Sequence, residues 1–183
     1  MSRIPAVDPA SAQGKAKELL DGVNKAFGVT PNLFRVAAQS PAALEGWLAL
    51  HGALGRGKLS AKVRAAIALT VAEANRCDYC VSAHTVLGKG AGLSENDMIR
   101  ARKGTATEPK VEAALRFARA LVRDRGVASD AEIAEVRKAG FTDGEIVEIV
   151  GAVAANIFTN YLNHVAATDI DFPVVRAKVD ATA

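Results

Sequence analysis

Apolar residues recur every three or four positions along most of this 183-residue chain, and no convincing stretch alternates apolar with polar residues. In residues 10–27, for example, Leu19, Leu20, Val23 and Phe27 lie on one side. That spacing is the repeat of one face of an α-helix, whereas strict alternation is the repeat of a β-strand. The pattern therefore predicts an all-α protein.

Capping residues mark where several of these helices begin. Ser40 precedes a proline, which is typical of a helix start, because serine can cap free N–H groups and proline needs no donor there. Ser129 with Glu132 and Thr142 with Glu145 have the spacing of capping boxes. We therefore expect helices over about residues 10–27, 32–38, 41–55, 60–75, 77–89, 94–103 and 109–126, a short helix after residue 129, and a long helix over about 142–168.

Length and charge limit the kind of protein that this chain encodes. At 183 residues it is expected to form a single domain over residues 1–183. Its net charge is only +3 and its Lys and Arg residues are scattered among acids, so no nucleic-acid partner is expected. No apolar run approaches the roughly 18 residues of a membrane span, so no membrane partner is expected. The first fifteen residues lack the features of a cleaved secretion signal, which indicates the cytoplasm.

The residues that can carry chemistry gather in one short segment. EANRCDYCVSAH, residues 73–84, holds both cysteines, Cys77 and Cys80, together with Tyr79 and His84. If a helix begins near Cys77, residues three and four positions apart share a face, so the two thiols and the imidazole can approach one another. The free N–H groups of a helix start favour a thiolate, and His84, with an ordinary pKa of about 6.5, can accept a proton and return it.

Such a pair suits reversible redox chemistry in a reducing compartment. A thiolate that attacks a peroxide oxygen becomes a sulfenic acid, and the partner thiol then condenses with it to form a disulfide. The helix start favours Cys77 as the attacking group, whereas proximity to His84 favours Cys80. The sequence leaves this choice open.

A metal site is an alternative use of the two cysteines. A structural zinc site needs four ligands, whereas only Cys77, Cys80 and His84 lie together here, with no second Cys-x-x-Cys or close histidine pair. Haem attachment requires a histidine directly after the second cysteine, where this chain has Val81. Two inert buried thiols beside a core histidine are the remaining structural alternative. We expect no metal and no cofactor.

The cysteine segment resembles a known motif. EANRCDYCVSAH followed by TVLGKGAGLS is similar to the core of the alkylhydroperoxidase D-like (AhpD-like), or carboxymuconolactone decarboxylase-like, superfamily. The segments GVTPNLFRVAAQSPAALEGW and FTDGEIVEIVGAVAANIFTNYLNHVAATDIDFP resemble its uncharacterised peroxidase-related members. The resemblance covers nearly the whole chain and indicates a redox core over about residues 60–103.

This resemblance implies a function and partners. It implies an all-α homo-oligomer that reduces a small peroxide with a cysteine pair, without haem, flavin or metal, and is reset by a lipoyl or thioredoxin-like dithiol reductant. Carried over by position, Cys77 and Cys80 match the redox pair, His84 matches the proton-relay histidine, and Tyr79 lies where relatives have His or Tyr.

One position departs from the family pattern. Relatives carry a glutamate twelve residues before the first cysteine, at the far end of the proton relay, and this chain has Ala65 there. Without that carboxylate, His84 is expected to be less well oriented and less basic. Glu73, near the end of the same helix, is a candidate substitute, although a solvated acid at a helix end is its more ordinary interpretation.

Two further groups of residues are candidates for supporting the site. Asn156, Asn160 and His164 repeat every four residues on the last helix, where they either line the cysteine pocket or form a hydrogen-bonded seam between helices or subunits. Trp47 and His51 either form the wall of a substrate entrance or belong to the core.

The favoured function is a thiol-dependent peroxidase or disulfide oxidoreductase acting on hydrogen peroxide or small organic hydroperoxides. The alternative is a redox sensor or oligomeric interaction protein whose cysteine pair oxidises without turnover. Ala65 favours this alternative, because the glutamate of the family's proton relay is missing there. Decarboxylation of the carboxymuconolactone type is a weaker alternative, because members of that branch generally lack the cysteine pair.

Overall fold

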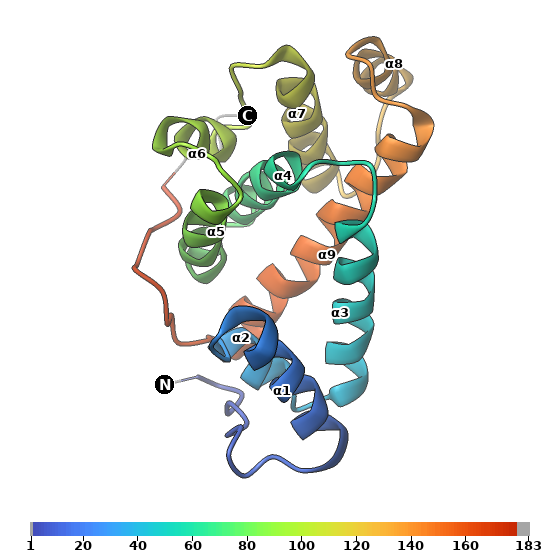
Figure 1. Ribbon diagram of the computed structural model, residues 1–183. Coiled ribbons are helices and arrows are strands. Elements are labelled where there is room, and N and C mark those ends of the chain that lie inside the picture. The colour runs from blue at the N-terminus through green and yellow to red at the C-terminus, as the bar shows by residue number, and fades with distance from the viewer. Residues whose placement is uncertain (1, 179–183) are drawn as a thin grey trace.

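Nine α-helices and no strands make up residues 2–178, the part of the chain that the structure describes (Figure 1). The structure is a computed structural model. Its helices are α1 (Gly14–Phe27), α2 (Asn32–Ala37), α3 (Pro41–Gly55), α4 (Ala61–Ala74), α5 (Asp78–Gly90), α6 (Glu95–Arg102), α7 (Pro109–Arg123), α8 (Asp130–Lys138) and α9 (Asp143–Ala166). The all-α prediction is confirmed.

Helix starts lie where the capping residues predict them. Ser40 Oγ accepts a hydrogen bond from the backbone N–H of Ala43 at the start of α3 (3.4 Å). Capping boxes open α8 at Ser129 and α9 at Thr142, as their spacing predicts, and a third opens α6. Each cap satisfies N–H groups that have no partner inside the helix.

Three helix boundaries differ from the prediction. α1 begins at Gly14 instead of about residue 10, because Asp8 closes a turn in which its carboxylate accepts the N–H of Ala10 (3.1 Å). α7 and α9 end two or three residues early, before Arg125 (φ 55°) and Ala167 (φ 48°) respectively. A residue in the left-handed region cannot continue a right-handed helix.

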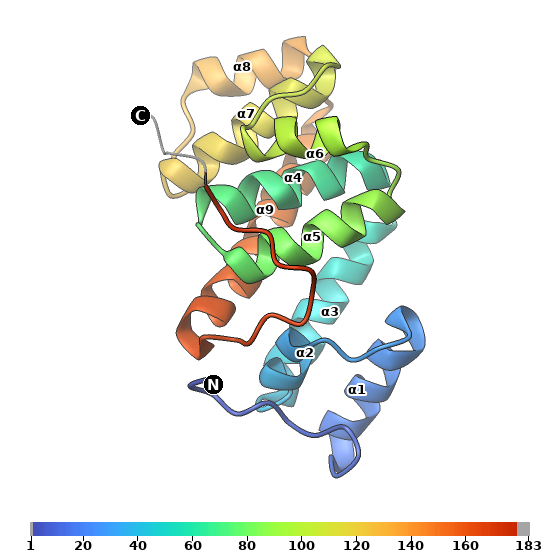
Figure 2. The same cartoon turned by 90° about the vertical axis from the view of Figure 1, so that its left-hand side faces the viewer.

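α4 is the central helix of the fold and packs against α5, α6, α7 and α9 (Figures 1 and 2). Residues 66–73 of α4 are all buried, so this helix has no solvent face over two turns. Its Ile67 and Leu69 meet Leu115 of α7 and Ile149 of α9 in the largest apolar cluster. A helix that is buried on all sides is the natural centre of a helical fold.

α9 packs its inner side on α3, α4 and α7 and contributes Ile149, Ala152 and Val153 to the core. Within residues 2–178 it is the single helix that is long and apolar enough to cross a membrane. The expectation that no segment reaches this size is therefore wrong for α9. The core helix of a globular fold passes the same test of length and composition.

Candidate functional site

Cys77 and Cys80 form a disulfide at the N-terminus of α5, with their Cα atoms 5.2 Å apart. Cys77 is the N-cap residue, and its Sγ accepts the backbone N–H of Cys80 (3.2 Å). After reduction, a thiolate here faces the free N–H groups and the positive end of the helix dipole. The two cysteines therefore lie together at a helix start, as their spacing predicts.

Both sulfurs are covered by other parts of the chain. Cys77 is 1% and Cys80 is 3% exposed. They belong to an apolar cluster with neighbouring residues of α5, against which Leu33, Phe172 and Val175 pack. Reagents therefore reach the sulfurs only past the segments that cover them.

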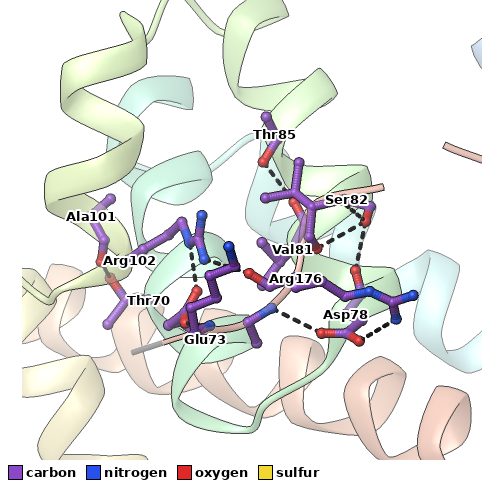
Figure 3. A network of polar contacts seen from close by, with 12 residues as sticks. Thr70, Glu73, Asp78, Val81, Ser82, Thr85, Ala101, Arg102 and Arg176 are labelled. Carbon is purple, nitrogen blue, oxygen red and sulfur yellow. Dashed lines mark hydrogen bonds and ion pairs between the residues drawn. The ribbon is translucent and has the colours of Figure 1, made fainter. Parts of the chain in front are cut away.

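One of these covers is the C-terminal strap, which we define as residues 170–178. It runs along α5 (Figure 2), and polar groups at the start of that helix hold it (Figure 3). The Asp78 carboxylate accepts hydrogen bonds from Arg176 Nη1 (2.7 Å) and from the backbone N–H of Ala177 (2.9 Å). Ser82 Oγ accepts the N–H of Val175 (2.9 Å) and donates to the carbonyl of Asp78 (2.7 Å).

Glu73 holds the end of the same strap. It is 3% exposed, so its interpretation as a solvated acid at a helix end is wrong. One carboxylate oxygen accepts Arg102 Nε (2.5 Å) and the other accepts the backbone N–H of Lys178 (2.7 Å). Arg102 also donates to the carbonyl of Arg176 (2.7 Å), so this ion pair joins α4, α6 and the strap (Figure 3).

His84 lies one turn beyond Cys80, with His51 and Asn156 as its neighbours. Burial of the ring lowers its pKa from 6.5 to about 4; repulsion from His51 adds to this, and a hydrogen bond with the Asn156 side chain opposes it. The ring is therefore neutral at pH 7 and can accept a proton, although it is a weaker base than ordinary histidine. Within residues 2–178 no hydrogen bond joins this ring to either sulfur.

His51 extends the site towards α3. Its ring stacks on Trp47 at 4.8 Å between centroids, and Trp47 Nε1 donates to the carbonyl of Ala155 in α9 (2.9 Å). Burial, and then the charge of Arg64, lower the pKa of His51. His84 thus has a second histidine, His51, as a neighbour, and Arg64 in turn lies near His51.

The depressed pKa of His84 predicts how stability depends on pH. Between about pH 6.5 and 4 the unfolded chain binds a proton at His84 that the folded chain does not, so the free energy of unfolding falls as the pH falls through this window. The slope from this group is at most about 1.4 kcal/mol per pH unit, and His51 acts with the same sign. In urea unfolding from pH 7 to pH 4.5, His84→Gln should lose less stability than the wild type. Parallel curves for the two proteins would contradict this assignment.

The polar stripe of α9 contacts residues on both sides of the cysteine pair in sequence, Asn75 and His84. Asn160 Oδ1 accepts Asn75 Nδ2 (2.9 Å), and His164 Nε2 donates to the carbonyl of Asn75 (2.9 Å). Asn75 lies two residues before Cys77, while Asn156 contacts His84, four residues after Cys80. The stripe therefore forms a seam between helices of one chain and borders the site at the same time.

Asn163 is a site residue that the sequence analysis missed. Its Nδ2 donates a hydrogen bond to Cys80 Sγ (3.3 Å), and it is 5% exposed. It follows Asn160 by three residues and therefore shares its face of the helix. The i, i+3 spacing was the signal that could have identified it.

The polar contact of Tyr79 is with α2. Its hydroxyl accepts the backbone N–H of Leu33 (3.0 Å), and its ring packs edge-on against Phe172 of the strap at 5.7 Å. Burial raises the pKa of this phenol above its usual range. The geometry gives Tyr79 contacts with α2 and the strap.

Within residues 2–178, no cluster of three or more His, Cys, Asp or Glu side chains is arranged to hold a metal ion.

Comparisons with known proteins identify a matching family model and similar folds. Residues 41–124 match the model of the carboxymuconolactone decarboxylase family. The chain is similar in structure to the AhpD core of an uncharacterised peroxidase-related protein from Ralstonia eutropha JMP134 (TM-score 0.81, 24% identity, covering 93% of this chain and 92% of that chain). No curated protein matches the sequence significantly.

Two further structures share the fold. An uncharacterised peroxidase-related protein from Silicibacter sp. TM1040 has a TM-score of 0.78 and 20% identity, covering 91% of this chain and 88% of that chain. The debrominase Bmp8 has a TM-score of 0.78 and 19% identity, covering 92% of this chain and 91% of that chain. The superfamily resemblance seen in the sequence is confirmed: residues 41–124 carry the carboxymuconolactone decarboxylase family match, within an AhpD-like fold.

Proposed function

We propose that this protein is a thiol-dependent peroxidase that reduces hydrogen peroxide or small organic hydroperoxides with Cys77 and Cys80. The observation that carries the proposal is the disulfide at the start of α5, which is the oxidised end state of such a reaction. The AhpD-like fold, shared with two peroxidase-related proteins, supports it. The cycle needs a reducing compartment, in keeping with a cytoplasmic location.

We propose Cys80 as the sulfur that attacks the peroxide. It is the sulfur that receives a side-chain hydrogen bond, from Asn163, and it lies one turn before His84. Cys77 Sγ receives a backbone N–H at the helix start instead. Because the helix start stabilises negative charge, the Cys77 thiolate is a good leaving group when a reductant attacks the disulfide at Cys80.

The reaction balances in three steps. The Cys80 thiolate attacks the terminal oxygen of R–O–O–H, the O–O bond breaks, and RO⁻ takes up a proton to leave as ROH. Cys80 is then a sulfenic acid, and Cys77 attacks its sulfur, releasing water and forming the disulfide. A dithiol reductant of the lipoyl or thioredoxin-like class returns both cysteines to thiols by exchange and is itself oxidised to a disulfide. Neutral His84 can take up the Cys80 thiol proton and return it to the leaving oxygen.

Catalytic consumption of peroxide tests this function. With excess dihydrolipoamide, or with reduced thioredoxin in a separate assay, the wild-type protein should consume many equivalents of hydrogen peroxide per chain. A single equivalent, followed by a stable disulfide, would instead support the redox sensor. Three observations favour that second candidate: the burial of both sulfurs, the low pKa of His84, and the absence of a carboxylate at Ala65.

We also propose that the protein forms a homo-oligomer through the outer side of α9. Large apolar side chains are exposed along this helix at helical spacing: Val147, Val150, Phe158, Tyr161 and Val165. A contiguous apolar stripe of this kind is typical of an interface. Sedimentation of the purified protein should give the mass of at least two chains, and Phe158→Lys should lower it. A single-chain mass for the wild type would refute the proposal.

A further inference from the structure

We propose that Asn163 is a catalytic residue that binds the incoming hydroperoxide beside Cys80. This inference rests on the proposed peroxidase function and identifies the group that holds its substrate. It starts from the Asn163 carboxamide, whose two ends have different surroundings in the structure.

The NH2 end of the amide faces the sulfur. Asn163 Nδ2 lies 3.3 Å from Cys80 Sγ. A disulfide sulfur has no hydrogen to donate and is only a weak acceptor, so the donor end of the amide is the one that suits this position. In the reduced protein the same N–H stabilises a Cys80 thiolate, because a hydrogen bond to a charged acceptor is stronger than one to a neutral sulfur.

The carbonyl end of the amide has no partner. Within residues 2–178, Asn163 Oδ1 is one of three buried side-chain atoms that have no hydrogen-bond partner. Asn163 as a whole is 5% exposed. Buried polar atoms are nearly always hydrogen-bonded in folded proteins, so an unpaired acceptor attached to a group that touches the redox sulfur requires a functional explanation.

A hydroperoxide supplies the missing donor. Its terminal O–H can donate to Asn163 Oδ1 while Asn163 Nδ2 holds the thiolate, so one rigid amide brings the attacking sulfur and the attacked oxygen together. Fixing two reactants in this way lowers the entropic barrier to their reaction. The substrate class is therefore hydrogen peroxide and small hydroperoxides that keep a free O–H, and dialkyl peroxides are excluded. The burial of Cys80 favours the smallest member of this class.

Asn163→Leu separates peroxide binding from thiolate stabilisation. Leucine has a similar size, has no polar atom to leave unpaired, and should keep the fold. The reduced protein is mixed with hydrogen peroxide and, separately, with iodoacetamide, which reacts with a thiolate without needing a peroxide site. At a pH above the Cys80 pKa, where the thiol is fully ionised in both proteins, the iodoacetamide rates should converge. The peroxide rate of Asn163→Leu should stay lower by about tenfold or more, the loss of one good hydrogen bond.

Thr168→Val is the matched control. Thr168 Oγ1 is another buried atom without a hydrogen-bond partner in the described part of the chain, just beyond α9, and its replacement should leave both rates unchanged. If Asn163→Leu does not fold, as judged by thermal unfolding, Asn163→Ala is measured in the same way. Equal loss of both rates at high pH, or no loss of either, would overturn the inference while leaving the peroxidase proposal intact. If the wild-type protein does not react with peroxide, that result would instead contradict the proposed peroxidase function itself.

Discussion

Cys80→Ser should reduce the reaction with hydrogen peroxide to background, whereas Cys77→Ser should still react once and then stop. Serine is nearly the same size as cysteine, but its hydroxyl does not ionise at neutral pH and does not attack peroxide. Each variant therefore removes one chemical role with little change in packing. If Cys80 attacks, its loss removes the first step. Loss of Cys77 removes only the second step, in which the sulfenic acid becomes a disulfide.

The two variants are distinguished by the product that each one forms. After one addition of peroxide, Cys77→Ser should carry one added oxygen, visible in the intact mass, and should react with the sulfenic-acid reagent dimedone. Cys80→Ser should show neither change. Neither variant should turn over peroxide with dihydrolipoamide. If the sulfenic acid instead appears in Cys80→Ser, the roles are reversed and the helix start, not the Asn163 side, selects the attacking sulfur.

Fold similarity does not decide between functions for this chain. Two peroxidase-related proteins and a debrominase match it with almost equal TM-scores. Activity therefore depends on the groups around the sulfurs, which can differ while the helices stay in place. In this chain those groups are Asn163 beside Cys80, and a neutral His84 that has His51 as a neighbour.

The helices and the cysteine pair could be predicted from the sequence because both depend on local spacing. Capping residues set the starts of α3, α8 and α9. The three-residue step from Cys77 to Cys80 brings the sulfurs together within one helical turn. Such features involve residues within a few positions of one another, and periodicity detects them.

Contacts between distant segments could not be predicted in this way. Asn163 and Cys80 are 83 positions apart, and Glu73 and Lys178 are 105 positions apart. No helical period relates such residues, because tertiary packing alone brings them together. For the same reason the burial of Glu73 could not be predicted. It lies near the end of a helix, where acids are usually solvated, but the strap covers it.

Arg102→Ala should lower the free energy of unfolding by about 3–5 kcal/mol, the usual cost of removing one partner from a buried ion pair. The Glu73 side chain is 2% exposed and that of Arg102 is 17% exposed. Without the guanidinium, the Glu73 carboxylate stays buried and loses its charged partner, and the strap loses the bond from Arg102 to the carbonyl of Arg176. Urea unfolding of the oxidised wild type and variant at pH 7 measures the difference.

Arg176→Ala is the control, because it also removes an arginine that holds the strap. Its pair with Asp78 is open to solvent, with 62% and 34% of the two side chains exposed, so its loss should cost only about 0.2–1 kcal/mol. Replacing Glu73 and Arg102 together by leucine should recover most of the stability lost in Arg102→Ala, because no unpaired charge then remains buried. Equal costs for Arg102→Ala and Arg176→Ala would show that the buried pair does not hold the strap. In that case the strap depends chiefly on its apolar contacts through Phe172 and Val175.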